Sequence, residues 1–244
     1  MNGRIVKLPV VDSTNTYARA LIGQIDPGNW LFVTTPEQFA GRGQKLRSWS
    51  SEPGKNLLCS FLYKPTDLAV SAQYGLSMAA CMAVIELLGK YGIQALVKWP
   101  NDILVDEKKI AGFLIENGVK GNKVEYTVIG LGLNVNQKRF SPFYWPATSM
   151  VKQTDEWGNP DALALEYLEL LVQWLEKGLE DINALHRVFE PYLYRLNQPT
   201  QLIYNDEIVV GIIRGVSREG QLIIEIGGEK RCFATGEIRI RSVR

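Results

Sequence analysis

The sequence predicts an α+β protein, in which a mixed β-sheet flanked by helices is followed by a small C-terminal β-barrel. In the first part, apolar runs of strand length are interleaved with stretches of helical periodicity. After residue 197 the pattern changes to five short strands within about 45 residues, separated by turns rich in Gly, Asn and Asp. We therefore expect one domain over residues 1–197 and a second over residues 198–244.

The first apolar run, residues 5–10, should form a strand. It is followed by residues 12–15, Asp-Ser-Thr-Asn, whose short polar side chains are typical of helix N-termini, and the helix should end near Gly23. A plain N-cap explains only one of these residues. Four in succession leave hydroxyl and amide groups available for a polar ligand.

The second strand, residues 30–35, leads into a segment, residues 37–51, with neither helical nor strand periodicity. Gly41 and Gly43 allow backbone amides to come close to a ligand. The same segment holds three cations and an indole ring: Arg42, Lys45, Arg47 and Trp49. This combination suits an anion that carries a ring system, such as a nucleotide, and a solvated basic loop is the alternative. The spacing matches neither the Walker loop nor the dinucleotide fingerprint.

The stretch around residue 100 places charges between two apolar runs, residues 93–97 and 110–115, which both read as buried strands. Residues 98–102, Lys-Trp-Pro-Asn-Asp, predict a turn, because proline restricts the residue before it and Asn-Asp favours turns. Strand alternation then puts Lys109 on the face opposite to Gly112, so that Lys109 need not be exposed. A glycine inside a strand indicates close approach by a ligand or another backbone.

The remaining elements follow from periodicity and from helix signals. We expect a strand over residues 56–64, a helix over 71–90 ended by Gly89 or Gly92, and a strand over 124–136 that contains Gly130 and Gly132. Asn159-Pro160-Asp161 predicts the start of a long helix, since it combines a cap, a proline in the first turn and an acid near the positive end. A shorter helix over 183–195 should be interrupted at Pro191.

Composition narrows the class of function. The chain has 244 residues, 46% hydrophobic and 22% charged, with net charge +1, so no field of one sign steers it to nucleic acid or to a membrane surface. The single histidine, His186, excludes a histidine-rich metal site and argues against a Ser-His-Asp or Cys-His nucleophile, because it lies in a stretch of helical periodicity rich in Leu and Phe. Chemistry must therefore depend on lysine, arginine, carboxylates and backbone amides. We interpret Cys59, Cys81 and Cys232 as reduced structural thiols.

From the sequence we expect no signal peptide and no apolar stretch that approaches the roughly 20 residues of a transmembrane helix. Together with the odd number of cysteines, this predicts a cytoplasmic protein without a membrane or nucleic-acid partner.

These motifs, taken together, resemble those of the biotin protein ligases (biotin–[carboxyl-carrier] ligases), a family related more distantly to lipoate ligases. The resemblance spans essentially the full chain. It rests on the following residues: 12–15, 41–43 with Arg47 and Trp49, 98–102, 109–112, 130–136, 147–149, 236–238 and Arg241. It implies a biotin/lipoate ligase-like catalytic domain and an SH3-like C-terminal barrel.

The resemblance also implies the reaction, that of a biotin–[acetyl-CoA-carboxylase] ligase. Biotin attacks the α-phosphate of Mg²⁺-bound ATP to give biotinyl-5′-adenylate and pyrophosphate. A lysine amine on a biotin carboxyl carrier protein domain then takes the biotinyl group and releases AMP. ATP, Mg²⁺ and biotin are thus the implied small-molecule partners, and the enzyme would be a monomer or a homodimer.

Roles for individual residues follow from the same resemblance. Lys109 would hold the biotin carboxylate and the bridging phosphate, Asp102 would act in metal binding and lysine activation, and Arg47 would be the third catalytic residue. The implied biotin-binding residues are Ser13, Thr14, Asn15, Gln38, Gly41, Arg42 and Gly112. The implied nucleotide-binding residues are Lys45, Trp49, Asn134, Glu237 and Arg241, of which the last two would reach the nucleotide from the C-terminal domain.

The chain departs from the family pattern at two points. Gln44 and Leu46 stand where arginine and glycine are frequent, so we expect Lys45 and Arg47 to carry the charge toward phosphate. Bifunctional members carry an N-terminal winged-helix DNA-binding domain, whereas here the ligase pattern begins within the first ten residues, which predicts a ligase without repressor activity.

Two other functions remain open from the sequence. A lipoate or octanoate ligase or transferase would use the same fold. A non-catalytic sensor of biotin or a nucleotide would use the same scaffold, although it would have no need of Lys109, Asp102 and Arg47 together.

Overall fold

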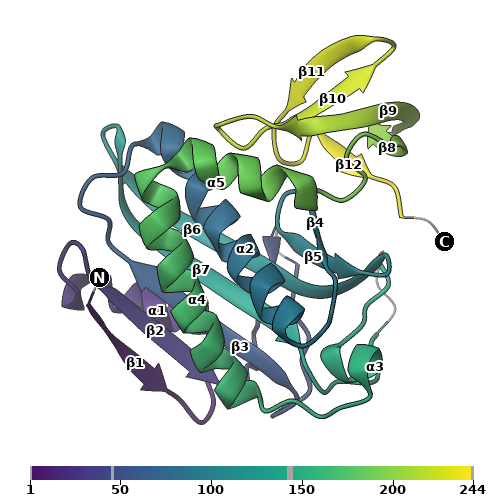
Figure 1. The fold of residues 1–244 in the computed structure, drawn as a ribbon. Helices are drawn as coiled ribbons and strands as arrows, with labels where there is room; N and C mark the ends of the chain where they lie inside the picture. Colours follow the sequence, from purple (N-terminus) through teal and green to yellow (C-terminus); the bar gives the residue numbers. More distant parts are fainter. Residues whose placement is uncertain (1, 45–46, 142–144, 243–244) are drawn as a thin grey trace.

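The computed structural model describes residues 2–44, 47–141 and 145–242, and its strands form two sheets (Figure 1). The larger sheet has seven strands in the order β1-β2-β3-β7-β6-β5-β4. Its strands are β1 (Gly3–Lys7), β2 (Trp30–Thr35), β3 (Asn56–Tyr63), β4 (Leu96–Lys98), β5 (Asp102–Val105), β6 (Lys108–Lys120) and β7 (Lys123–Asn134). β1 and β2 are parallel and the other pairs are antiparallel, so the predicted mixed sheet is confirmed.

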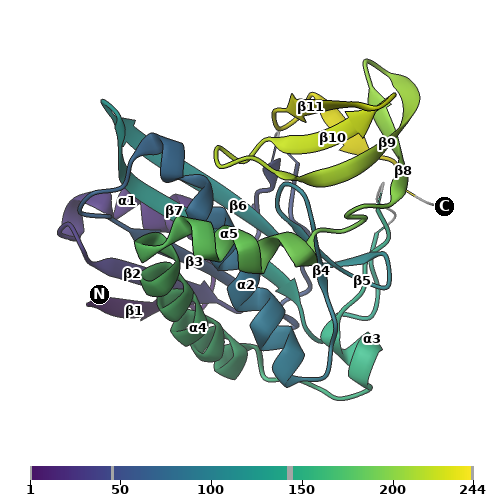
Figure 2. The ribbon, with the colours of Figure 1, turned by 45° about the horizontal axis from the view of Figure 1, so that its top comes forward.

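Three helices cover one face of this sheet, as Figures 1 and 2 both show. They are α2 (Tyr74–Lys90), α4 (Pro160–Glu180) and α5 (Ile182–Phe189). The main hydrophobic core lies between them and the sheet, and it includes the fully buried side chains of Phe61, Leu76 and Tyr167. Burial of this apolar surface is the main source of stability for the sheet.

The opposite face of the sheet carries the short helix α1 (Thr14–Ala20), which packs on β2, β3 and β7. A second, smaller core there contains Ala18, Leu31 and Leu62. Ser13 occupies the N-cap position of α1, but its side chain makes no capping hydrogen bond. The polar side chains at the start of α1 are therefore not consumed by capping, and much of this face remains available beside the helix.

Two predicted strands have different boundaries in the structure. The first strand is Gly3–Lys7 and not residues 5–10. Strand β4 begins at Leu96, whereas we predicted a strand from residue 93. Gly92 has φ of +70°, and the amide of Ile93 donates to the carbonyl of Leu88, so these residues terminate α2.

The segment Val70–Lys90 joins a 3-10 helix (Val70–Ala72) to α2 and corrects one expectation. By length and hydropathy it could cross a membrane, although we expected no stretch of that length. About two thirds of its apolar window, 67%, is buried inside the molecule, as is usual for the core helix of a globular protein.

The second sheet is antiparallel, with the order β11-β10-β9-β8-β12. Its strands are β8 (Pro199–Tyr204), β9 (Glu207–Val216), β10 (Leu222–Ile226), β11 (Glu229–Phe233) and β12 (Ile238–Ile240). The five predicted strands are thus present. Among the described residues no ladder joins β11 to β12, so closure into a barrel stays a prediction.

Side chains from the first part of the chain fasten the second sheet in place. The indole nitrogen of Trp99 donates to the carbonyl of Gly220 at 2.9 Å, and His186 Nε2 donates to the carbonyl of Val216 at 2.7 Å. His186 is therefore a packing residue that links α5 to the last residue of β9. Figure 2 shows the second sheet at one end of the molecule, beside α5 and the β4–β5 hairpin.

The cysteines have two different environments. Cys59 and Cys81 are buried, and burial raises the pKa of both thiols far above its ordinary value. Cys232 lies exposed on β11, so burial does not protect this thiol as it does the other two. No disulfide joins them.

The N-terminus of α4 provides a test of local stability. Asn159 Oδ1 accepts hydrogen bonds from the amides of Asp161 and Ala162, at 3.0 and 3.3 Å. Asn159→Ala should lower the free energy of unfolding by about 1 kcal/mol in urea denaturation, because these amides lose their acceptor. Asn159→Ser, which keeps an acceptor, should change it by only a few tenths, and equal losses in both variants would contradict the capping role.

Candidate active site

The floor of the site is a row of residues that runs across the large sheet. Register pairs Lys98 with Asp102, Asp102 with Gly112, Gly112 with Gly132, and Gly132 with Leu58, so all five share the face that carries α1. A Cβ atom on Gly132 would lie 2.3 Å from the indole ring of Trp49, so the ring rests directly on the glycine backbone. Glycine at this position is therefore a packing requirement.

A carboxylate between two lysines forms the charged centre of the site. Asp102 Oδ1 lies 2.5 Å from Lys109 Nζ, and Oδ2 lies 3.1 Å from Lys98 Nζ. Burial by itself raises the pKa of Asp102, but the charges of Lys109 and Lys98 and their hydrogen bonds outweigh it and hold the pKa below its ordinary value of 3.8. The three side chains together carry one net positive charge, which attracts anions.

A bulge in β6 brings Lys109 to this centre. Ile103 pairs with Ala111 but the next residue, Leu104, pairs with Lys109, so Ile110 is an extra residue in the ladder. Our alternation put Lys109 and Gly112 on opposite faces, and this is wrong. The bulge adds one residue to the count, and Lys109 Nζ lies 2.8 Å from where a Gly112 Cβ would be.

A polar cluster beside the lysines joins α1 to the sheet. Gln38 Oε1 accepts from the amide and the hydroxyl of Thr14, at 2.8 and 3.1 Å. Ser60 Oγ lies 2.7 Å from Thr14 Oγ1 and 2.6 Å from Asn15 Oδ1. A Cβ on Gly130 would lie 2.0 Å from Asn15 Oδ1, so glycine is required here too. We call Thr14, Asn15, Gln38 and Ser60 the polar cradle.

Two residues of this region were missed by the sequence analysis. Ser60 is fully buried at the centre of the cradle, and its signal was a lone hydroxyl within an apolar strand. Glu116 accepts from Asn15 Nδ2 at 2.9 Å and pairs with Arg42 at 3.5 Å. No local pattern pointed to Glu116, because its partners are distant in the sequence.

The segment between β2 and β3 forms the outer wall. The amide of Gly43 donates to the carbonyl of Arg47 at 2.7 Å, and the amide of Trp49 donates to that of Gly41 at 2.9 Å. Lys109 Nζ lies 5.4 Å from the centre of the Trp49 ring, within cation–π range. Trp49 Nε1 is buried without a hydrogen-bond acceptor among the described residues. Lys45 lies outside the described residues.

These groups surround one cavity of about 660 Å³, a size typical of ligand sites. Its lining includes most of the residues singled out from the sequence: Ser13, Thr14, Asn15, Gln38, Arg42, Arg47, Trp49, Asp102, Lys109, Gly112 and Asn134. Asn134 is buried and donates to the carbonyl of Thr148 at 2.9 Å.

Three predicted residues do not line the cavity. Gly41 lies just behind Trp49, where a Cβ would meet the Trp49 carbonyl at 2.7 Å. Glu237 accepts from the amide of Ala234 at 2.7 Å, and Arg241 donates to Gln201 at 2.8 Å. Both are exposed on the second sheet, so a nucleotide role for Glu237 and Arg241 stays a prediction.

Comparison with known proteins identifies the family of this fold and site. Residues 8–134 match the model of the biotin/lipoate A/B protein ligase family, and residues 196–241 match that of the biotin protein ligase C-terminal domain. The chain belongs to the biotin/lipoate A/B protein ligase family. The second match covers the second sheet, so both parts of the chain are accounted for.

Individual relatives within the family agree with this assignment. The chain is 33% identical to the bifunctional ligase/repressor BirA of Escherichia coli (strain K12), over 98% of this chain and 75% of that protein. It is 26% identical to the biotin–[acetyl-CoA-carboxylase] ligase of Paracoccus denitrificans, over 93% and 96%. Its structure is similar to that of the biotin protein ligase from Aquifex aeolicus in complex with biotin and ATP, with a TM-score of 0.79, 25% identity and coverage of 98% and 99%.

Replacing Asp102 tests the charged centre. Asp102→Asn should lower the free energy of unfolding by about 3 kcal/mol at pH 7, because it leaves two half-buried ammonium groups without their carboxylate. The folded-state pKa of Asp102 is depressed, so its contribution is complete above 3.8 and is lost as the pH falls through the lower folded value. The difference in free energy of unfolding between variant and parent, measured by urea denaturation, should therefore become smaller below pH 3.8.

Glu229→Gln is the matched control, since Glu229 pairs with Arg231 at 3.0 Å on the exposed surface of β11. It should change the free energy of unfolding by less than about 0.5 kcal/mol, both at pH 7 and below pH 3.8. A pH-independent gap for Asp102→Asn would contradict the depressed pKa.

Proposed function

We propose that this chain is a biotin protein ligase that biotinylates a lysine in an ATP-dependent reaction through biotinyl-5′-adenylate. The observation that carries the proposal is the position of the Lys98–Asp102–Lys109 centre next to the polar cradle, within one cavity. The cradle suits an uncharged polar ring, and the lysines suit anions. Biotin has such a ring, the ureido group, at one end and a carboxylate at the other.

In the first step the chain's task is to bring two anions together. The biotin carboxylate must approach the α-phosphate of ATP so that a carboxylate oxygen bonds to phosphorus as the bond to pyrophosphate breaks. Lys109 and Lys98 reduce the repulsion between these groups, because they place two positive charges where negative charge collects in the transition state. Asp102 keeps both ammonium groups in position.

Other residues would orient the two substrates. Thr14, Asn15 and Gln38 offer donors and acceptors that match the N–H and C=O groups of a ureido ring. Trp49 closes the cavity with a flat apolar face. Exclusion of water by this wall protects the mixed anhydride from hydrolysis.

The second step would take place at the open side of the cavity. The amine of a lysine on a biotin carboxyl carrier protein domain attacks the acyl carbon of the adenylate, and AMP leaves with the electron pair of the acyl–oxygen bond. Support for a carrier of this kind comes from the name of the Paracoccus denitrificans relative.

Mg²⁺ would enter with ATP. The described residues contain no cluster of three or more metal-ligating side chains, and both oxygens of Asp102 already contact lysines. Mg²⁺ commonly uses substrate phosphates, water and one or two carboxylates. The ion would therefore be held mainly by the phosphates and water, where it would neutralise phosphate charge. A bond from Asp102 to the ion would require one carboxylate oxygen to leave its lysine, so the metal role of Asp102 stays a prediction from the sequence.

The cradle also bears on the choice between biotin and lipoate. The dithiolane ring of lipoate has no N–H or C=O groups, so it would form no such hydrogen bonds with Thr14, Asn15 and Gln38, which line the cavity. Biotin is thus favoured over lipoate. A cytoplasmic location and an oligomeric state of monomer or homodimer are further proposals that rest on the sequence.

The decisive measurement is ATP–pyrophosphate exchange with the purified chain. Exchange should require biotin, and lipoate at equal concentration should support at least about a hundredfold less, because the cradle's polar groups gain no partner from it. Exchange with lipoate would favour the lipoate ligase, and biotin binding without exchange would favour the sensor.

Lys109→Ala should lower the exchange rate by about 10²- to 10³-fold, since one preorganised cation is removed from the reacting phosphate. Lys108→Ala is the matched control, because Lys108 precedes Lys109 in β6 and is exposed. Its exchange rate should stay within about twofold of the parent. Similar losses in both variants would mean that local folding, and not the ammonium group of Lys109, is responsible.

A further inference from the structure

The turn between β5 and β6 has an unusual backbone for its sequence. Asp106 has φ of +46° and Glu107 has φ of +61°, the left-handed region in which glycine or asparagine is favoured. A side chain in this conformation is strained, and such strain persists where surrounding contacts hold it. The contacts of Glu107 therefore need an explanation beyond the turn itself.

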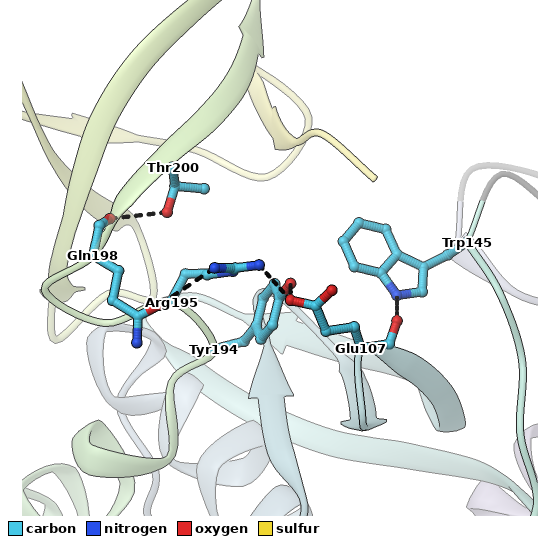
Figure 3. A network of polar contacts seen from close by, with 6 residues as sticks. All are labelled: Glu107, Trp145, Tyr194, Arg195, Gln198 and Thr200. Carbon is cyan, nitrogen blue, oxygen red and sulfur yellow. Dashed lines mark hydrogen bonds and ion pairs between the residues drawn. The ribbon is translucent and has the colours of Figure 1, made fainter. Parts of the chain in front are cut away.

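Glu107 binds the segment that leads to the second sheet. Its carboxylate forms an ion pair with Arg195 and accepts from the hydroxyl of Tyr194 at 3.1 Å (Figure 3). Arg195 in turn reaches Gln198 at 3.5 Å, and the hydroxyl of Thr200 donates to the carbonyl of Gln198 at 2.9 Å. Figure 3 shows these side chains in one line from the hairpin to the start of β8.

The same segment is fixed to the second sheet by its backbone. The amide of Asn197 donates to the carbonyl of Ile213 in β9 at 2.8 Å, and Leu196 forms an isolated parallel bridge with Ile213. A group that holds Arg195 therefore also holds β9, the central strand of the second sheet.

On its other side Glu107 touches the wall of the active site. Its carbonyl accepts from Trp145 Nε1 at 2.7 Å, and the Trp145 ring meets Tyr194 edge-on with centroids 6.0 Å apart. Lys98 Nζ lies 4.8 Å from the centre of the Trp145 ring. Tyr194 and Glu107 together thus set the position of the ring against which Lys98 rests.

The Trp145 segment also supports Lys109 and Asn134. The amide of Lys109 donates to the carbonyl of Pro146 at 2.7 Å, and the amide of Thr148 donates to that of Lys109 at 2.9 Å. Asn134, the predicted nucleotide residue within the cavity, donates to the carbonyl of Thr148. None of these contacts involves the polar cradle, whose residues Thr14 and Asn15 belong to α1.

We propose that Glu107 is a positioning residue, which couples the second sheet to the nucleotide side of the active site through Arg195, Tyr194 and Trp145. The inference rests on the proposed adenylation reaction and assigns a role in that reaction to a residue outside the cavity. Glu107 does not line the cavity and touches no substrate. Its carboxylate acts through the Trp145 ring and Lys98, so ATP use should depend on it and biotin binding should not.

The turn geometry permits a substitution that separates the carboxylate from the backbone. Glu107→Gly keeps the carbonyl that accepts from Trp145 and favours the positive φ, but it removes both the ion pair and the Tyr194 contact. Asp106→Gly is the matched control, because it relieves the neighbouring position of the same turn and leaves Glu107 in place. Thermal unfolding of both variants would check that each remains folded.

Exchange kinetics with varied ATP at saturating biotin are the readout. Glu107→Gly should raise the KM for ATP about tenfold, within the range by which residues remote from a ligand alter its binding. Asp106→Gly should leave the KM within about twofold, and the dissociation constant for biotin should stay unchanged in both.

Substitutions of Arg195, alone and with the charges of the pair exchanged, test the ion pair from its other side. Arg195→Ala should reproduce the increase in KM for ATP, and Glu107→Arg combined with Arg195→Glu should recover part of it, because the pair is restored with its signs reversed. An unchanged KM for ATP in Glu107→Gly would overturn the proposal, as would an equal weakening of biotin binding. Absence of biotin-dependent exchange in the parent chain would instead refute the ligase function, so the two failures are distinguishable.

Discussion

The placement of Asp102 between Lys98 and Lys109 is the interaction on which the rest of the site depends. Two ammonium groups within about 3 Å of one half-buried carboxylate would repel each other if the carboxylate were absent. With the carboxylate present they lie close together, and the three side chains keep one net positive charge. This net positive charge reduces the repulsion between two anionic reactants that must come together in the site.

The large sheet makes this arrangement rigid. Its strands carry an apolar core on the face covered by α2 and α4, which fixes their register, and register in turn fixes the row from Lys98 to Leu58 on the other face. Glycine in that row brings Trp49 down onto the backbone. Packing on one side of the sheet thus determines the geometry of chemistry on the other, and the second sheet adds a further support at one end.

Much of the site could be predicted because its residues occur in short polar motifs at the ends of apolar runs. The turn at residues 98–102, the polar start of α1 and the glycine- and arginine-rich segment before β3 all lie around one cavity. Ser60 and Glu116 escaped prediction, since each acquires its partners only when α1 docks on the sheet. Glu237 and Arg241 are the reverse case, because motifs near the C-terminus singled them out and the structure pairs them within the second sheet.

By itself the sequence determined the fold class, the division of strands into two groups and the residue types of the site, because periodicity and turn chemistry are local properties. Only the tertiary structure decided which face Lys109 occupies. Strand alternation assumes a regular ladder, and the extra residue at Ile110 is visible only once β5 and β6 are paired. The same holds for Glu107, an exposed acid in a turn by sequence, whose partner Arg195 lies 88 residues away.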